Sequence, residues 1–231
     1  MLPLVAVVTS IEGTTTPLSF IRSVLFPFAR ERLPGFLQAH ADDPEVVRHL
    51  AEVRRLVPGR PELQTLLRWT DQDAKITPLK ALQGMVWREG YAEGGLAGAV
   101  YADVPPALRR WSAAGLRLYC FSYGSTEAQR LIVGHSAAGD LSGLFSGFFD
   151  TCIGGKREPE SFSRLAIGMG LPPAEILYLS DVEAELDAAA TAGMRTCQMV
   201  RSGSGTRASE RHPVAADFTA VAARMGLAGG G

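Results

Sequence analysis

The sequence predicts an α/β fold, a doubly wound parallel sheet with an all-helical insertion after its first strand. Short apolar runs without polar alternation recur along the chain, as in strands buried on both faces. From residue 103 onward, helical patterns separate these runs. Between residues 20 and 98, apolar residues recur at three- and four-residue spacing and no strand pattern interrupts them. Strands that alternate with helices indicate a parallel sheet.

The first strand is expected at residues 4–9, which read LVAVVT. A β-branched run of this kind is typical of a central strand in a parallel sheet. A loop with Gly13 and Pro17 follows it directly. Open α/β sheets bind their ligands at the carboxyl ends of strands, so this loop is a candidate binding element.

The helical insertion separates the first strand from the rest of the sheet. We expect its helices at residues 20–36, 43–57, 61–73 and 79–89, with the glycine-rich stretch 90–98 as a return linker. Residues 1–18 and 99–231 are therefore assigned to an α/β core domain with a Rossmann-like sheet, and residues 19–98 to a helical cap domain.

The remaining core elements follow in alternation. Strands are expected at residues 116–121, 147–153, 176–179 and 195–200, and helices at 105–114, 126–133, 160–169 and 182–192. Cys152, inside the third strand, is expected to be a small buried hydrophobe. Residues 201–211 are interpreted as a solvated loop, and the tail at 229–231 as disordered.

The composition excludes several classes of partner. The 231 residues carry a formal net charge of −1 and no long basic run, so neither nucleic acid nor an anionic membrane is expected as a partner. The apolar run at residues 2–8 is too short to span a bilayer. Three widely spaced cysteines without a CxxC pattern indicate neither disulfides nor zinc and are typical of the cytoplasm. We expect a cytoplasmic monomer.

Four polar clusters each follow a predicted strand, and in a parallel sheet all four would meet at one edge. Their members are Ser10 and Glu12; Ser122 with the backbone amides of Tyr123 and Gly124; Lys156; and Asp181 with Glu185. Singly, these residues are ordinary: a turn serine, a solvated lysine and an aspartate that caps a helix. Four clusters in this order are a far more specific pattern.

Phosphoryl transfer needs these groups. A phosphate dianion requires a cation, a hydroxyl and backbone N–H groups around its oxygens, and a metal to neutralise developing charge. Lys156 supplies the cation, and Ser122 with the turn after it supplies the hydroxyl and amides. Mg²⁺ prefers oxygen ligands, for which the Asp181 carboxylate and the Glu12 carbonyl are suited.

The pattern resembles the phosphatases of the haloacid dehalogenase (HAD) superfamily, and in finer detail the enolase-phosphatase E1 family. Stretches that carry the finer resemblance span nearly the whole chain: IEGTTTP at residues 11–17, VLFPFA at 24–29, DAK at 73–75, LKALQG at 79–84, YGS at 123–125, GHS at 134–136, SD at 180–181 and ELDAA at 185–189.

The resemblance implies a Mg²⁺-dependent phosphatase of methionine salvage (acireductone synthase). Its substrate would be 2,3-diketo-5-methylthiopentyl-1-phosphate, which the family enolises and then dephosphorylates to the acireductone, with the helical insertion as a cap. Lys156 and Ser122, with Tyr123 and Gly124, would hold the phosphate. Residue 10, the Glu12 carbonyl and Asp181 would hold Mg²⁺. Glu185 would orient a metal-bound water.

Ser10 departs from the family, whose loop begins with an aspartate that attacks phosphorus and ligates the metal. A serine hydroxyl is not ionised at neutral pH and needs an adjacent base. We therefore predict that phosphatase turnover is lost or very low. Three explanations stay open: a deliberate replacement, natural loss of the step, or Ser10 as a nucleophile with Glu12 as its base, which we rank lowest.

Three further functions remain as alternatives. The chain could enolise the diketo phosphate without releasing phosphate, because Mg²⁺ and a base suffice for proton abstraction. It could be a catalytically dead protein that binds phosphate esters. A haloacid dehalogenase shares the fold, but its nucleophile at this position is also aspartate, and the cap pattern disfavours it.

Overall fold

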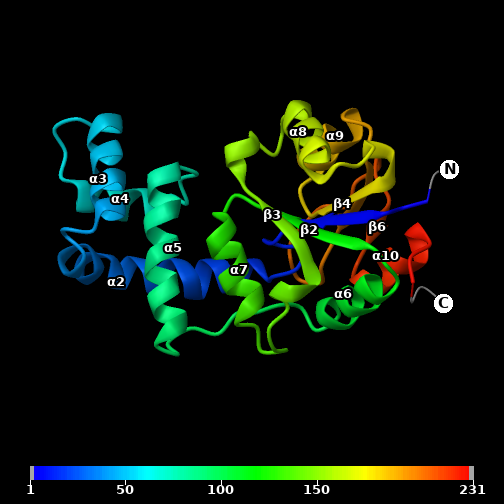
Figure 1. Cartoon of the computed structure of the whole chain (residues 1–231), viewed down its shortest axis with the longest axis horizontal. Coiled ribbons are helices and arrows are strands. Elements are labelled where there is room, and N and C mark those ends of the chain that lie inside the picture. The colour runs from blue at the N-terminus through cyan, green and yellow to red at the C-terminus, as the bar shows by residue number, and fades with distance from the viewer. Residues whose placement is uncertain (1–2, 229–231) are drawn as a thin grey trace. The chain divides into compact units, whose positions relative to one another are not determined.

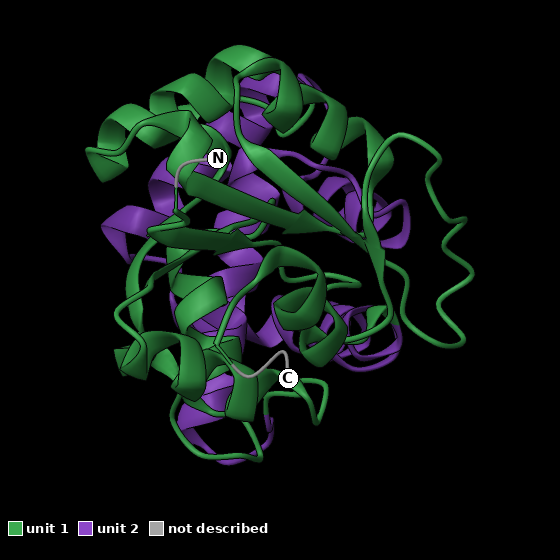
Figure 2. Ribbon diagram, turned by 90° about the vertical axis from the view of Figure 1, so that its right-hand side faces the viewer, with its two compact units in different colours: residues 1–18, 98–231 green, residues 19–97 purple. Residues whose placement is uncertain are grey.

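The computed structural model describes residues 3–228 and confirms the predicted parallel α/β sheet. The predictions made for Leu2 and for the tail at 229–231 lie outside these residues. The chain forms two compact units, one of residues up to Leu18 together with those from Gly98 onward, the other Ser19–Ala97 (Figure 2). Within the described chain, every helix is too short or too polar to cross a lipid bilayer.

The sheet of the first unit has six strands among the described residues, and every neighbouring pair is parallel. They are β1 (Ala6–Thr9), β2 (Arg117–Phe121), β3 (Phe145–Phe149), β4 (Ile176–Ser180), β5 (Arg195–Met199) and β6 (Val214–Ala215). Their order is β3-β2-β1-β4-β5-β6. Strand β1 is central, with Val8 opposite Tyr119 on one side and Tyr178 on the other. The carboxyl ends of β1, β2 and β4 therefore lie side by side.

Helices cover both faces of this sheet, as the alternation of strands and helices predicts (Figure 1). They are α6 (Val104–Ala113), α7 (Thr126–Gly134), α8 (Pro159–Met169), α9 (Glu183–Thr191) and α10 (Phe218–Met225). Val7 of β1 packs in one core with Trp111 of α6 and Phe218 of α10. Val8, one residue on, packs in the other core with helices α8 and α9. This two-sided burial explains the unbroken apolar character of the strands.

The second unit is helical. It contains a π-helical turn at Ile21–Leu25 and the helices α2 (Phe26–Ala39), α3 (Pro44–Leu56), α4 (Glu62–Asp71) and α5 (Thr77–Ala92), while the short α1 (Leu18–Phe20) begins at its boundary. Asp43 caps α3 by accepting hydrogen bonds from the amides of Glu45 and Val46. Trp87 is buried and donates its indole N–H to the carbonyl of Leu25 at 2.8 Å. Helices α2 to α5 pack against one another and bury apolar side chains, so the unit has a core of its own.

Several element boundaries differ from the sequence predictions. Strand β3 begins at Phe145 and ends at Phe149, because Asp150 accepts a hydrogen bond from the Cys152 amide at 2.9 Å and starts a 3₁₀ turn. Cys152 is therefore exposed, not buried as expected. Helix α5 continues to Ala92, so the linker expected at residues 90–98 is shorter.

The carboxyl-terminal region holds the largest differences from the predictions. Strand β6 and helix α10 were not predicted. Arg201 was expected in a solvated loop but is only 4% exposed. Its guanidinium contacts Thr14 and Asp103, both far away in sequence. A polar stretch of sequence gives no sign that one of its charges is paired across the fold.

Candidate active site

The residues that the sequence singled out converge on one cavity of about 70 Å³ at the carboxyl ends of the strands. It is lined by Ser10, Glu12, Leu18, Ser122, Tyr123, Lys156, Asp181, Val182 and Glu185. Gly124 lies beside it, with its amide 3.4 Å from the Ser122 hydroxyl oxygen. The structure thus brings together all the predicted site residues, which come from four separate segments of the chain.

The loop after β1 is a tight turn. The Ser10 amide donates to the Leu179 carbonyl of β4 at 2.9 Å, and the amides of Thr15 and Thr16 both donate to the Ile11 carbonyl. Gly13 has a φ of +69°, a conformation that favours glycine. A Cβ atom on Gly13 would collide with the Asp181 carboxylate. The turn therefore places its backbone directly against the carboxylate that follows β4.

Lys156 is the cation of the site and is 2% exposed. Its Nζ donates to the Ser10 hydroxyl oxygen at 2.9 Å and lies 2.8 Å from Oε2 of Glu185, which is 1% exposed. The same ammonium lies 5.1 Å from the ring centroid of Tyr123. A buried ammonium with these contacts is fixed in place, as a group that binds phosphate must be.

Glu185 is held by two residues of β4 that the sequence analysis missed. Its Oε2 accepts hydrogen bonds from the Tyr178 hydroxyl at 2.9 Å and from the Ser180 hydroxyl at 2.8 Å. Burial, together with the negative charge of Glu185, raises the pKa of Tyr178 well above its usual value. Residues 178 and 180 are two apart on one strand and share a face, which is the signal that could have identified them.

The turn after β2 is held by Gln129, which the sequence analysis did not select. The Gln129 amide group donates to the carbonyls of Gly124 at 2.8 Å and of Phe149 at 2.7 Å. Ser125 caps helix α7 by accepting from the Ala128 amide. The Ser122 hydroxyl and the amides of the next residues therefore lie just before a helix amino terminus, a position that favours anions.

Asp181 is a partly buried carboxylate of the site. Burial raises its pKa from 3.8 to about 6, and the negative charges of Glu185 and Glu12 act in the same direction, whereas Lys156 opposes them. A carboxylate destabilised in this way favours a cation beside it. The expected ligands are all oxygens, the donor type that Mg²⁺ takes.

The donor set also limits how a metal could be held. Among residues 3–228, no three His, Cys, Asp or Glu side chains are grouped so that they could hold a metal ion. A metal here would take the Asp181 carboxylate, the Glu12 carbonyl and the Ser10 hydroxyl, with water completing its coordination. Mg²⁺ fits such a set, because it keeps several waters and often takes only one or two carboxylates.

Comparison with known proteins identifies the family. The model of haloacid dehalogenase-like hydrolases matches residues 17–193. The chain is 55% identical to Enolase-phosphatase E1 of Granulibacter bethesdensis, covering 98% of this chain and 99% of the relative. It is 52% identical to Enolase-phosphatase E1 of Acidiphilium cryptum, covering 94% of each chain.

Solved structures agree with this assignment. The UTR4 protein of Saccharomyces cerevisiae is 30% identical, with a TM-score of 0.77 over 93% of this chain and 98% of that one. An L-2-haloacid dehalogenase, 20% identical with a TM-score of 0.60 over 98% of this chain and all of that one, shares the fold. These matches confirm the resemblance found in the sequence: the chain belongs to the enolase-phosphatase E1 family of phosphatases, within the haloacid dehalogenase-like hydrolases.

Proposed function

We propose that this chain is a Mg²⁺-dependent enolase-phosphatase of methionine salvage, impaired in phosphate release because Ser10 replaces the family's aspartate. Its substrate would be 2,3-diketo-5-methylthiopentyl-1-phosphate, a small phosphate ester. We further propose that it acts as a monomer in the cytoplasm, without a nucleic-acid or membrane partner. The relatives' name, Enolase-phosphatase E1, and the agreement of the site with the family's motifs support this proposal.

The observation that carries the proposal is the grouping of Lys156, Ser122 and Asp181 around one cavity. The Lys156 ammonium would bind two phosphate oxygens electrostatically, while the Ser122 hydroxyl and the amides of Tyr123 and Gly124 would donate to them. Glu185 keeps Lys156 in position through their 2.8 Å ion pair. These contacts would orient the phosphorus atom toward residue 10.

The loop after β1 and the carboxylate after β4 would hold the metal. Asp181, the Glu12 carbonyl and the Ser10 hydroxyl would hold Mg²⁺, which supplies positive charge that stabilises the oxygens of the reacting phosphate and of the neighbouring diketone. The raised pKa of Asp181 supports a cation at this place. Residues 19–98 would be the helical cap domain that the resemblance implies.

The Ser10 hydroxyl would be a poor substitute for the aspartate nucleophile, because the group that contacts it, the Lys156 ammonium, is an acid and not a base. The Lys156 ammonium, paired with Glu185, donates a hydrogen bond to the Ser10 oxygen. An ammonium has no lone pair with which to take the hydroxyl proton. Lys156 therefore cannot be the base that a hydroxyl nucleophile needs, which leaves Glu12 as the candidate base, the explanation ranked lowest.

Restoring the nucleophile tests the proposal. In the Ser10→Asp variant with Mg²⁺, phosphate release from the diketo phosphate should rise at least about a thousandfold, because losing a nucleophile costs several orders of magnitude. Ser10→Asn is the matched control, since it has the size of aspartate without its charge, and it should show no gain. Equal, low release from all three chains would count against the assignment of the β1 loop.

A second candidate is a protein that binds the phosphate ester without turnover. The Lys156–Ser10 hydrogen bond favours it, because the pocket keeps its cation while the nucleophile is absent. Tight binding of the diketo phosphate with no release of phosphate, even from Ser10→Asp, would support this candidate. Absorbance of the enol without phosphate release would instead show that enolisation survives by itself.

A further inference from the structure

We propose that Arg201 and Gln198, at the carboxyl end of β5, are positioning residues for the two loops that would hold Mg²⁺. The inference rests on the metal site of the proposed function, and it concerns residues that the sequence analysis did not select. Arg201 holds the loop after β1, and Gln198 holds the main chain of Asp181. Neither side chain lines the cavity, so each would act through the loop that it contacts.

Arg201 binds the far end of the β1 loop. Its Nη2 and Nε donate to the Thr14 carbonyl at 2.7 and 3.1 Å, and its Nη1 donates to both carboxylate oxygens of Asp103 at 2.8 Å. The guanidinium also lies 4.2 Å from the ring centroid of Tyr101 and 5.2 Å from that of Phe218. It is thus fixed on all sides, and Thr14 is fixed with it.

The geometry of this contact requires arginine. A guanidinium is a planar fork that can bond a carbonyl with one edge and a carboxylate with another, whereas a lysine ammonium is a point charge. Asp103 is in turn fixed, because its Oδ2 also accepts from the Phe218 amide at 2.8 Å. The Thr14 carbonyl lies two residues after Glu12, so its position constrains the Glu12 carbonyl through the tight turn.

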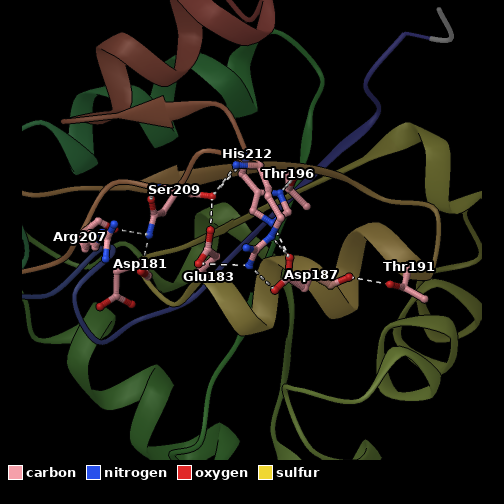
Figure 3. Close-up of polar contacts among 10 residues, drawn as sticks. Asp181, Glu183, Asp187, Thr191, Thr196, Arg207, Ser209 and His212 are labelled. Carbon is pink, nitrogen blue, oxygen red and sulfur yellow. Dashed lines mark hydrogen bonds and ion pairs between the residues drawn. The ribbon is translucent and has the colours of Figure 1, made fainter.

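Gln198 holds the second loop. Its side-chain nitrogen donates to the Asp181 carbonyl and to the Arg207 carbonyl, both at 3.1 Å, while its side-chain oxygen accepts from the Ser209 amide at 2.7 Å. Gln198 is 1% exposed. The Ser209 hydroxyl in turn donates to Glu183 at the start of α9 (Figure 3). Asp181 is therefore fixed from the side of β5.

The two held loops meet at one contact. The Gly13 backbone lies so close to the Asp181 carboxylate that a Cβ atom would collide with it. A shift of either loop would therefore change the spacing between the Asp181 carboxylate and the Glu12 carbonyl. Mg²⁺ demands near-ideal octahedral geometry, so its affinity is sensitive to such a shift.

Three variants test the inference. Arg201→Lys keeps the charge but loses the fork, and Gln198→Glu keeps the size but loses both donors. Arg55→Gln is the control, because it removes an exposed ion pair with Glu52 within the helical unit and touches neither loop of the site. Binding of Mg²⁺ and of inorganic phosphate is measured by calorimetry, amide exchange at residues 13–16 by mass spectrometry, and the unfolding midpoint without metal by circular dichroism.

If Arg201 and Gln198 position the two loops, their variants should lose Mg²⁺ affinity selectively. Arg201→Lys and Gln198→Glu should each weaken Mg²⁺ binding by about tenfold or more, as substitutions behind metal ligands do. Phosphate affinity should stay within about twofold, because Lys156 and Ser122 come from other segments. Arg201→Lys should also speed exchange at residues 13–16, and the control should match the parent. Equal loss of both affinities, or loss only in proportion to the unfolding midpoint, would show a merely structural role and overturn the proposal.

The exchange measurement separates this inference from the proposed metal site. If the parent binds phosphate but not Mg²⁺, the metal assignment fails, and faster exchange in Arg201→Lys would still support the role of Arg201 in fixing the loop. If exchange at residues 13–16 and Mg²⁺ affinity are both unchanged in Arg201→Lys, the inference is wrong whatever the metal does.

Discussion

Asp181 is a residue of the site whose charge changes close to neutral pH. Burial raises its pKa to about 6, so the metal-free carboxyl is ionised above that pH and protonated below it. Mg²⁺ and the proton compete for the same oxygens. We expect the Mg²⁺ dissociation constant to rise by about tenfold for each pH unit below 6 and to be constant above pH 7.

Calorimetric titration with Mg²⁺ between pH 5 and 8 measures this dependence. The control is Asp181→Asn, which should bind Mg²⁺ weakly and with no inflection near pH 6. The raised pKa of Asp181 also affects the stability of the metal-free fold. Because the folded-state pKa lies above the unfolded value of 3.8, the protonated carboxyl contributes stability below pH 3.8, and this contribution is lost as the pH rises to 6. A parent chain whose Mg²⁺ affinity does not change between pH 5 and 7 would contradict this prediction.

Gly13 is the residue whose missing side chain matters most to the metal ligands. Gly13→Ala should cost roughly 1–2 kcal/mol of unfolding free energy, because its φ is +69°, and it should also displace the Asp181 carboxylate and weaken Mg²⁺ binding. Gly170→Ala is a matched control with a φ of +64° and open space around it. Chemical denaturation should show similar losses for both, with only Gly13→Ala losing Mg²⁺ affinity. Equal Mg²⁺ affinities in the two variants would show that the close contact is unimportant.

At the scale of elements, strand β4 and helix α9 are joined to the lysine loop by the Lys156–Glu185 pair. Both side chains are almost fully buried, with Nζ and Oε2 2.8 Å apart. Removing one partner leaves an uncompensated buried charge, so Lys156→Met should lower the unfolding free energy by about 3–5 kcal/mol. Urea denaturation measures the loss.

The double variant identifies the cause of that loss. Adding Glu185→Gln to Lys156→Met removes the unpaired carboxylate, while the Gln oxygen can still accept from Tyr178 and Ser180. Most of the lost stability should return, although phosphate binding should not, because the cation is absent. If the double variant is less stable than Lys156→Met, the loss reflects packing rather than charge.

The elements themselves show what the sequence predicts and where it fails. Strands β1, β2 and β4 are buried on both faces and could be located from their apolar runs. The strand predicted at residues 147–153 lies several residues beyond the observed β3. The apolar pattern continues past the strand end into a segment that forms a 3₁₀ helix, which Asp150 caps. Strand β6 has only two residues, too few for a periodic pattern.

At the scale of the whole molecule, the candidate site was predictable because topology determines it. Parallel strands place their carboxyl ends on one edge, so Ser10, Ser122, Lys156 and Asp181 had to come together once the strands were located. The supporting contacts were not predictable, because Arg201 reaches Thr14 across 187 residues and Asp103 across 98. Such pairings depend on tertiary packing, of which a polar stretch of sequence carries no sign.

The two compact units predict that the α/β unit folds without the helical one. The chain leaves the α/β unit after Leu18 and returns to it at Gly98. The Tyr101 amide donates to the Thr15 carbonyl at 2.9 Å, so each of the two ends to be joined lies three residues from this hydrogen bond. A flexible linker of about ten residues can span that gap, since an extended chain covers roughly 3.3 Å per residue.

We expect the chain with residues 19–97 replaced by such a linker to unfold cooperatively and to bind inorganic phosphate, because both cores of the sheet and the Lys156 pocket lie within this unit. Circular dichroism and calorimetry check this, with Lys156→Met in the shortened chain as the control for binding. A shortened chain without a cooperative transition would show that the sheet depends on the helical unit for its stability.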